Sequence, residues 1–166
     1  DHQVIVSNLV YALPDATLFH FGVMTSAMHN AFMRFTCGRL KSDFRYSNTI
    51  VYNNYPWPGF AGEPLSDKHR TAIEQAAQCV LDARAQFTSS SLADLYDPLT
   101  MPPALLKAHQ KLDTAVDAAY QPSGGKKSYA SDAERVAFLF DLYQRITSLL
   151  PAPASKKTRK TQATES

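Results

Sequence analysis

Residues 41–48 of the chain read Lys-Ser-Asp-Phe-Arg-Tyr-Ser-Asn. Successive side chains of a β-strand point to opposite faces, so a run of this kind predicts a strand with two unlike faces. Extended back to Gly38, the alternation puts three cations, a carboxylate and a hydroxyl on one face: Arg39, Lys41, Asp43, Arg45 and Ser47. The other face carries Leu40, Phe44 and Tyr46, and the strand is expected to continue through residues 49–52.

The charged face of this strand has two interpretations. Arg, Lys and Asp are side chains that recognise guanine and cytosine edges in a DNA groove, which favours a nucleic-acid surface. Alternatively, the face belongs to a solvated edge strand whose charges prevent aggregation. The strand by itself leaves both interpretations open.

The composition limits what the whole chain can be. It has 166 residues, 45% hydrophobic and 19% charged, which fits one globular domain or a small pair. The net charge is only +2, so any nucleic-acid surface has to be local. No run approaches the roughly 18 apolar residues of a membrane span.

The chain opens on Asp1 without an initiator Met, and we expect a fragment of a longer protein. Cys37 and Cys79 lack metal-ligand spacing and are expected to be buried, reduced thiols.

The remaining pattern predicts an α+β chain that is mostly helical. A strand is expected at residues 3–12, and one long helix at residues 16–37, where apolar residues recur at spacings of three and four. A linker follows residues 53–59, with a boundary near residue 62. The second half predicts a three-helix unit, with helices at residues 67–87, 103–120 and 132–150 and a short turn at residues 92–96. Residues 151–166 carry four cations without apolar periodicity, which predicts a mobile, basic tail.

Motifs of known catalytic chemistry are absent from the sequence. It has no glycine-rich phosphate loop, no His-Glu-x-x-His and no Gly-x-Ser-x-Gly. Residues 53–58 (Asn-Asn-Tyr-Pro-Trp-Pro) share letters, but not their order, with the Asn-Pro-Pro-aromatic loop of DNA amino-methyltransferases. We therefore expect Trp57 to pack on a neighbour rather than stack on a flipped base. His109 lies in an apolar helical stripe and is expected in a core or an interface.

Two blocks of sequence resemble a known family. The first is Gly-Arg-Leu-Lys-Ser-Asp-Phe-Arg-Tyr-Ser-Asn at residues 38–48, followed by residues 50–58. The second is Leu-Ala-Asp-Leu-Tyr-Asp-Pro at residues 92–98, with Met101-Pro102 and residues 105–120. Together they resemble the C-terminal part of MmeI-like type IIL restriction–modification proteins. In that family one chain carries an endonuclease, an adenine-specific DNA methyltransferase, a target-recognition domain and a C-terminal helical domain.

The resemblance implies a domain plan and a set of DNA-contacting residues. Residues 1–62 would end a target-recognition domain, residues 63–150 would form the helical C-terminal domain, and residues 151–166 would be the tail. The base-reading positions of the family match Lys41, Asp43 and Arg45, and family members differ at the first two. Our hypothesis is that Lys41 and Asp43, about 6–7 Å apart along a strand, read one G·C pair while Arg45 reads an adjacent purine. Phosphate contacts are expected from Arg39, Ser47 and Asn48.

The resemblance also implies partners and cofactors. The partners would be double-stranded DNA and the methyltransferase domain of the same parent chain, in a bacterial cytoplasm and without a membrane. No catalytic residue, metal or cofactor is expected in this fragment. S-adenosylmethionine, and Mg²⁺ if the parent cuts DNA, are expected in the parent protein, a site-specific adenine methyltransferase. The alternative is a helical module that binds or braces another protein without touching DNA.

Overall fold

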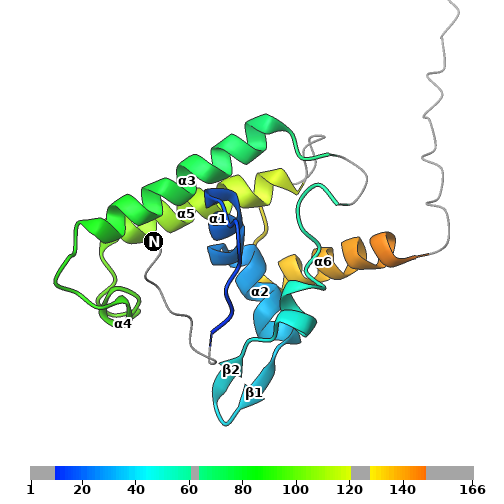
Figure 1. Cartoon of the computed structure of the whole chain (residues 1–166), viewed down its shortest axis with the longest axis horizontal. Helices are drawn as coiled ribbons and strands as arrows, with labels where there is room; N and C mark the ends of the chain where they lie inside the picture. The colour runs from blue at the N-terminus through cyan, green and yellow to red at the C-terminus, as the bar shows by residue number, and fades with distance from the viewer. Residues whose placement is uncertain (1–9, 61–63, 121–127, 149–166) are drawn as a thin grey trace, which may run out of the picture.

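The computed structural model describes residues 10–60, 64–120 and 128–148, and they form a mostly helical α+β fold as expected (Figure 1). Nine elements follow one another: α1 (Leu18–Thr25), α2 (Ala27–Thr36), β1 (Gly38–Leu40), β2 (Asp43–Arg45), η1 (Asn48–Tyr52), α3 (Asp67–Ala85), α4 (Leu92–Leu95), α5 (Pro103–Ala119) and α6 (Asp132–Thr147). Within these ranges no helix is both long and apolar enough to cross a membrane.

The long helix expected at residues 16–37 is two helices, because Ser26 interrupts it. Ser26 has an extended backbone (φ −68°, ψ 159°) and is the N-cap of α2. Its hydroxyl donates to the Val23 carbonyl at 2.7 Å and accepts the His29 N–H at 3.4 Å. The Asp113 carboxylate, from α5, accepts the Ala27 N–H at 2.7 Å. These bonds satisfy the backbone groups that the break exposes, so the chain can turn there.

The single charged strand expected at residues 39–52 is a hairpin followed by a π-helix. β1 and β2 are antiparallel and pair Gly38 with Arg45, Arg39 with Phe44 and Leu40 with Asp43. Lys41 and Ser42 form the two-residue loop between them, and Lys41 has a positive φ of 57°. Residues 49–52 belong to η1, a π-helix whose N-cap Ser47 accepts the Ile50 N–H at 3.3 Å.

The helices expected in the second half are confirmed, with ends that shift by a few residues. Pro103 opens α5, as proline can in a first helical turn. Ser131 caps α6 by accepting the Glu134 N–H at 3.3 Å. The expected boundary near residue 62, the tail at residues 151–166 and most of the expected strand at residues 3–12 lie outside the described residues. Val10 to Ala12, the described end of that strand, are not in a sheet.

One hydrophobic core joins the two halves of the chain. α1 packs against α3 and α5, and α2 packs against α6. Gly22 of α1 allows the closest approach, since a Cβ there would lie 2.8 Å from Ile73 Cγ2 of α3 and 3.3 Å from Leu112 Cδ1 of α5. The fully buried side chains come from both halves: Val23, Met28, Val51, Ile73, Val80, Leu105, Leu112, Val116 and Leu139.

Buried polar pairs complete this core. The Tyr120 hydroxyl of α5 donates to the Tyr55 hydroxyl at 2.6 Å. Arg135 of α6 forms an ion pair with Asp117 of α5 at 2.9 Å, and these side chains are only 12% and 3% exposed. Within the described residues, every buried side-chain nitrogen or oxygen has a hydrogen-bond partner. The helices can therefore pack closely without the cost of burying an unpaired polar atom.

Candidate nucleic-acid interface

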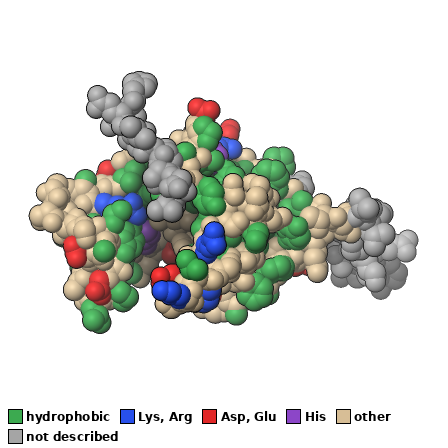
Figure 2. Space-filling model, turned by 60° about the horizontal axis from the view of Figure 1, so that its bottom comes forward, with side chains coloured by type: hydrophobic (Ala, Val, Ile, Leu, Met, Phe, Trp, Pro, Cys, Tyr) green, Lys and Arg blue, Asp and Glu red, His purple; other side chains and the backbone are tan. Residues whose placement is uncertain are grey.

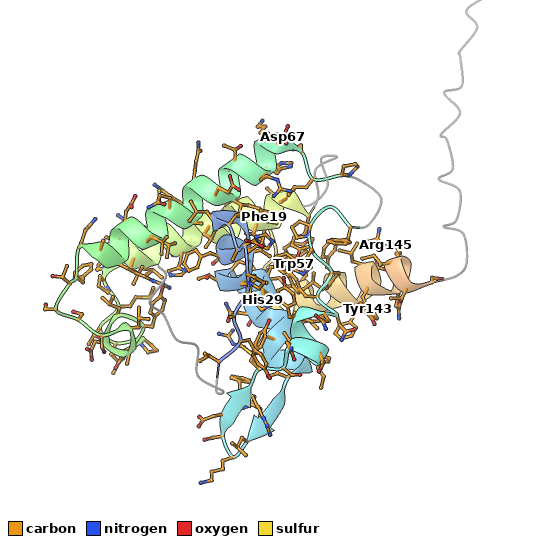
Figure 3. The ribbon with its side chains drawn as sticks, viewed as in Figure 1. Phe19, His29, Trp57, Asp67, Tyr143 and Arg145 are labelled. Carbon is orange, nitrogen blue, oxygen red and sulfur yellow. The ribbon has the colours of Figure 1, made fainter. Side chains whose placement is uncertain are left out.

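The β1–β2 hairpin projects from the body of the molecule below α2 (Figure 1), and every strand residue in it is exposed. In Figure 3 its side chains point away from the helices. Figure 2 brings this side of the molecule forward and shows Lys and Arg side chains gathered there beside acidic ones. The predicted apolar face is therefore not packed on a core: Leu40 is 63% and Phe44 is 41% exposed.

The hairpin register decides which side chains share a face. Directly opposite residues of an antiparallel pair point to the same side, as do residues i and i+2 of one strand. Asp43 and Arg45 therefore share a face, as expected, and Leu40 joins them. Arg39 lies on the other face with Phe44, which corrects the expected grouping. The error arose because a turn at residues 41–42 reverses the chain.

Arg39 is held in place by its neighbours in the hairpin. Its guanidinium carbon lies 4.2 Å from the centroid of the Phe44 ring, a cation–π contact. The same guanidinium donates to the Ser42 carbonyl at 3.3 Å. These contacts orient a charge that is otherwise open to solvent, and they leave most of its hydrogen-bond donors free.

Lys41, Asp43 and Arg45 have no such partners. Within the described ranges, none of these side chains makes a hydrogen bond or an ion pair. Lys41 sits at the tip of the hairpin and Asp43 begins the returning strand, so both leave the same end of it. Three exposed charges on a short two-stranded ribbon are thus available to an external ligand.

The base of the hairpin is fixed to α2. The Tyr46 hydroxyl lies 3.2 Å from His29 Nε2, and the Cys37 thiol lies 3.6 Å from Met33 Sδ. Burial, assisted by Tyr52, raises the pKa of Tyr46 to about 12. Burial also lowers the pKa of His29 to about 4, although a backbone hydrogen bond with Met24 opposes the shift. Both groups are neutral at pH 7, so the joint between hairpin and body carries no charge.

Ser47 and Asn48, the expected phosphate ligands, begin η1 and hydrogen-bond to it. The Ser47 hydroxyl lies 3.0 Å from Thr49 Oγ1 in addition to accepting the Ile50 N–H. Asn48 Oδ1 accepts the Thr49 N–H at 2.8 Å. The structure therefore shows a local capping role for both residues, and their contact with phosphate stays a prediction.

Trp57 packs in an aromatic cluster, as expected. Its ring centroid lies 5.5 Å from those of Tyr52 and Tyr55, 5.7 Å from that of His20 and 6.4 Å from that of Phe19. These contacts hold the chain between η1 and α3 against α1 (Figure 3). Trp57 is a structural side chain.

His109 and the two cysteines lie outside the hairpin, and their surroundings were not fully predicted from the sequence. His109 Nε2 lies 2.7 Å from the Tyr96 hydroxyl, which links α5 to the end of α4, a contact that the helical pattern did not reveal. Burial, and next the charge of Arg84, lower the pKa of His109. Both cysteines are free, but Cys37 is half-buried and Cys79 is exposed, which corrects the expectation of two buried thiols. The described residues contain no cluster of three His, Cys, Asp or Glu side chains able to hold a metal ion.

Comparisons with known proteins point to one family. The model described as "MmeI, target recognition domain" matches residues 1–59, and the model described as "MmeI, C-terminal domain" matches residues 65–151. The DNA methyltransferase A of Bacillus subtilis (strain 168) is 41% identical over 145 residues, which are 87% of this chain and 15% of that protein. A solved structure of the type IIL restriction–modification enzyme MmeI in complex with DNA matches with a TM-score of 0.73 at 48% identity. That match covers 82% of this chain and 17% of the other.

Proposed function

This chain belongs to the MmeI family, and on that premise we propose that its β1–β2 hairpin reads the base edges of double-stranded DNA. The reader would act within a longer restriction–modification methyltransferase, since the chain spans 15% and 17% of the two relatives it matches. One observation carries the proposal: Lys41, Asp43 and Arg45 are exposed and unpaired on a hairpin that projects from the region matched to a target-recognition domain.

A hairpin suits this task because the major groove of B-DNA admits a two-stranded β-ribbon. Within the groove, Lys donates to O6 and N7 of guanine, and a carboxylate accepts from the N4 amine of cytosine. Lys41 and Asp43 leave the same end of the hairpin, on either side of Ser42, so together they can address the two halves of one G·C pair.

Arg45 lies two residues from Asp43 on the same face, about 7 Å along the strand. We assign it to a neighbouring purine. Arg39 points to the opposite face, which frees it to contact a phosphate while the first face reads bases. Such contacts, with Ser47 and Asn48, would fix the register of the hairpin on DNA without carrying sequence information.

The longer protein would be an adenine-specific DNA methyltransferase of the bacterial cytoplasm that uses S-adenosylmethionine, with Mg²⁺ if it also cuts DNA. This chain would supply recognition and contact the methyltransferase domain of the same protein. The family resemblance supports these assignments, and no residue described in this chain is assigned to the cofactor.

The test is a charge exchange in the full-length protein. Lys41→Asp with Asp43→Lys keeps the net charge and reverses the donor and acceptor, so one base pair of the recognised sequence should change. The readout is the set of methylated sites, mapped by sequencing the modified DNA. A good pair of base contacts contributes roughly 1–3 kcal/mol of discrimination, so the preference should shift by about 5-fold to 150-fold.

The matched control exchanges Asp141 and Arg145, an exposed ion pair of α6 at 2.9 Å that lies away from the hairpin (Figure 3). This control variant should methylate the original sites. Unchanged methylation sites in the Lys41/Asp43 variant would refute base reading by this pair. A site change in the Asp141/Arg145 variant would show that charge exchange acts indirectly.

A further inference from the structure

The α4 segment, defined here as residues 91–101, presents apolar side chains to solvent. Leu92 is 61% and Leu99 is 93% exposed, and Leu106, one turn into the following helix, is 46% exposed. The segment lies at the end of the α3–α5 pair (Figure 1). At that end of the molecule, Figure 2 shows hydrophobic side chains interspersed with acidic and basic ones.

The α4 segment is rigid although it is short. Ser91 and Asp94 form a reciprocal cap: the Ser91 hydroxyl donates to the Asp94 carboxylate at 2.7 Å and accepts the Asp94 N–H at 3.2 Å. The Leu99 N–H donates to Asp97 Oδ1 at 2.8 Å, and the Met101 N–H donates to the Asp97 carbonyl at 2.9 Å. The Thr100 hydroxyl donates to the Asp94 carbonyl at 3.0 Å.

Two side chains fasten the α4 segment to the helices behind it. Leu95 is buried, and the Tyr96 hydroxyl lies 2.7 Å from His109 Nε2 of α5. The Arg84 guanidinium of α3 donates to the same hydroxyl from its Nε at 2.8 Å. The backbone that carries the exposed leucines is therefore ordered, so a partner that covers them has little backbone left to order.

The charge of the α4 segment selects the kind of partner. Asp94 and Asp97 are its charged residues, and it contains no Lys or Arg. Hydrogen bonds from Ser91 hold the pKa of Asp94 below its usual range, so the carboxylate is ionised at neutral pH. Arg84 of α3 adds a positive charge against Tyr96, with its guanidinium carbon 5.0 Å from the ring centroid. An apolar surface with charges of both signs suits a protein surface better than a uniformly negative phosphate backbone.

We propose that the α4 segment docks onto the methyltransferase domain that belongs to the same longer protein. Most of the length of both matched relatives lies outside the region that this chain covers, which provides the partner surface. The inference rests on the proposed place of this chain in a methyltransferase. It does not depend on base reading by the hairpin, which projects from a different part of the fold.

The experiment measures thiol labelling in the full-length protein without DNA. Leu92→Cys and Leu99→Cys place thiols on the α4 segment without disturbing a buried contact. Gln75→Cys on α3 and Gln144→Cys on α6 are matched controls at exposed helical positions. Each labelling rate, identified by mass spectrometry of the modified peptide, is divided by the rate for the same site in urea. We expect this ratio to be about tenfold or more lower at residues 92 and 99 than at the controls, because a covered thiol reacts slowly.

Equal ratios at all four sites would overturn the docking proposal. Protection that appears only when DNA is added would assign the surface to DNA. Protection that increases with protein concentration would assign the surface to a second copy of the protein. Either result would also overturn the docking proposal. Because the protection that supports docking is measured before any DNA is added, failure of the docking proposal is separate from failure of base reading, which methylation mapping tests.

Discussion

Lys41 has a φ of 57°, in the left-handed region where an L-residue is strained by roughly 1–2 kcal/mol. Asparagine tolerates this conformation better than most residues, whereas a β-branched residue is a genuine outlier there. Residue 41 must therefore adopt a positive φ, and its side chain is the one that we assign to base reading. Strain of this kind often accompanies a functional site.

At the residue scale, comparing Lys41→Val with Lys41→Asn separates the effect of the positive φ from the effect of losing the charge. Both variants remove the charge, but Val should open the hairpin more easily, by about 1–2 kcal/mol relative to Asn, because of its strained φ. Hydrogen exchange of the β1 and β2 amides measures this opening. Equal protection in the two variants would contradict the assigned turn.

The sequence predicted the exposure of Lys41, Asp43 and Arg45 but not the turn between the strands. Two-residue hairpin loops usually contain Asn-Gly, Asp-Gly or Gly, which have low cost at positive φ. Lys41-Ser42 carries no such signal, and the alternation of charged and apolar residues continued across it. The three residues are exposed, but their arrangement on the hairpin required the structure, and the base reading that the resemblance implied stays a prediction.

At the element scale, the three long C-terminal helices were predictable because their signals are local. Apolar periodicity, a proline at the first turn of α5 and the serine cap of α6 all lie within the element concerned. The break between α1 and α2 was not predictable in this way. Serine caps are common signals, and one of the bonds that satisfy the break comes from Asp113, which is 86 residues from Ala27 in the sequence.

α6 carries a matched pair of arginines for testing how helices are held together. Arg135→Ala should destabilise the protein by roughly 3–5 kcal/mol, because Asp117 would remain buried without its partner. Arg145→Ala removes the same side chain from an exposed pair with Asp141 and should cost roughly 0–0.5 kcal/mol. Urea unfolding of both variants measures the difference. Similar losses would show that the Asp117–Arg135 pair does not hold α5 to α6.

At the scale of the whole molecule, His29 makes stability depend on pH. Its folded-state pKa is about 4, against 6.5 for the free side chain, so the unfolded chain binds the proton first as the pH falls. Stability is therefore complete above pH 6.5 and is lost as the pH decreases towards 4. The loss between pH 7.5 and pH 5 should be about 2 kcal/mol.

Unfolding free energies of the wild type and of His29→Gln at these two pH values test this expectation. The variant has no titrating ring at this position, so its pH dependence should be smaller by that amount. Burial raises the pKa of Asp113, which acts with the opposite sign and is present in both proteins, so it cancels in the comparison. An equal pH dependence of the two proteins would rule out His29 as the cause.

The close approach of Gly22 to Ile73 and Leu112 limits how the two segments of the chain can be exchanged between relatives during evolution. The segments on either side of residue 62 match separate family models, yet both supply buried side chains to the same interior. A recombination event between relatives that replaced only the first segment would bring together surfaces that had not evolved as a pair. The strand residues of the hairpin are exposed and take no part in this interior, so point substitutions there leave the interior intact. If the hairpin reads bases as proposed, such substitutions are the route by which its specificity would change.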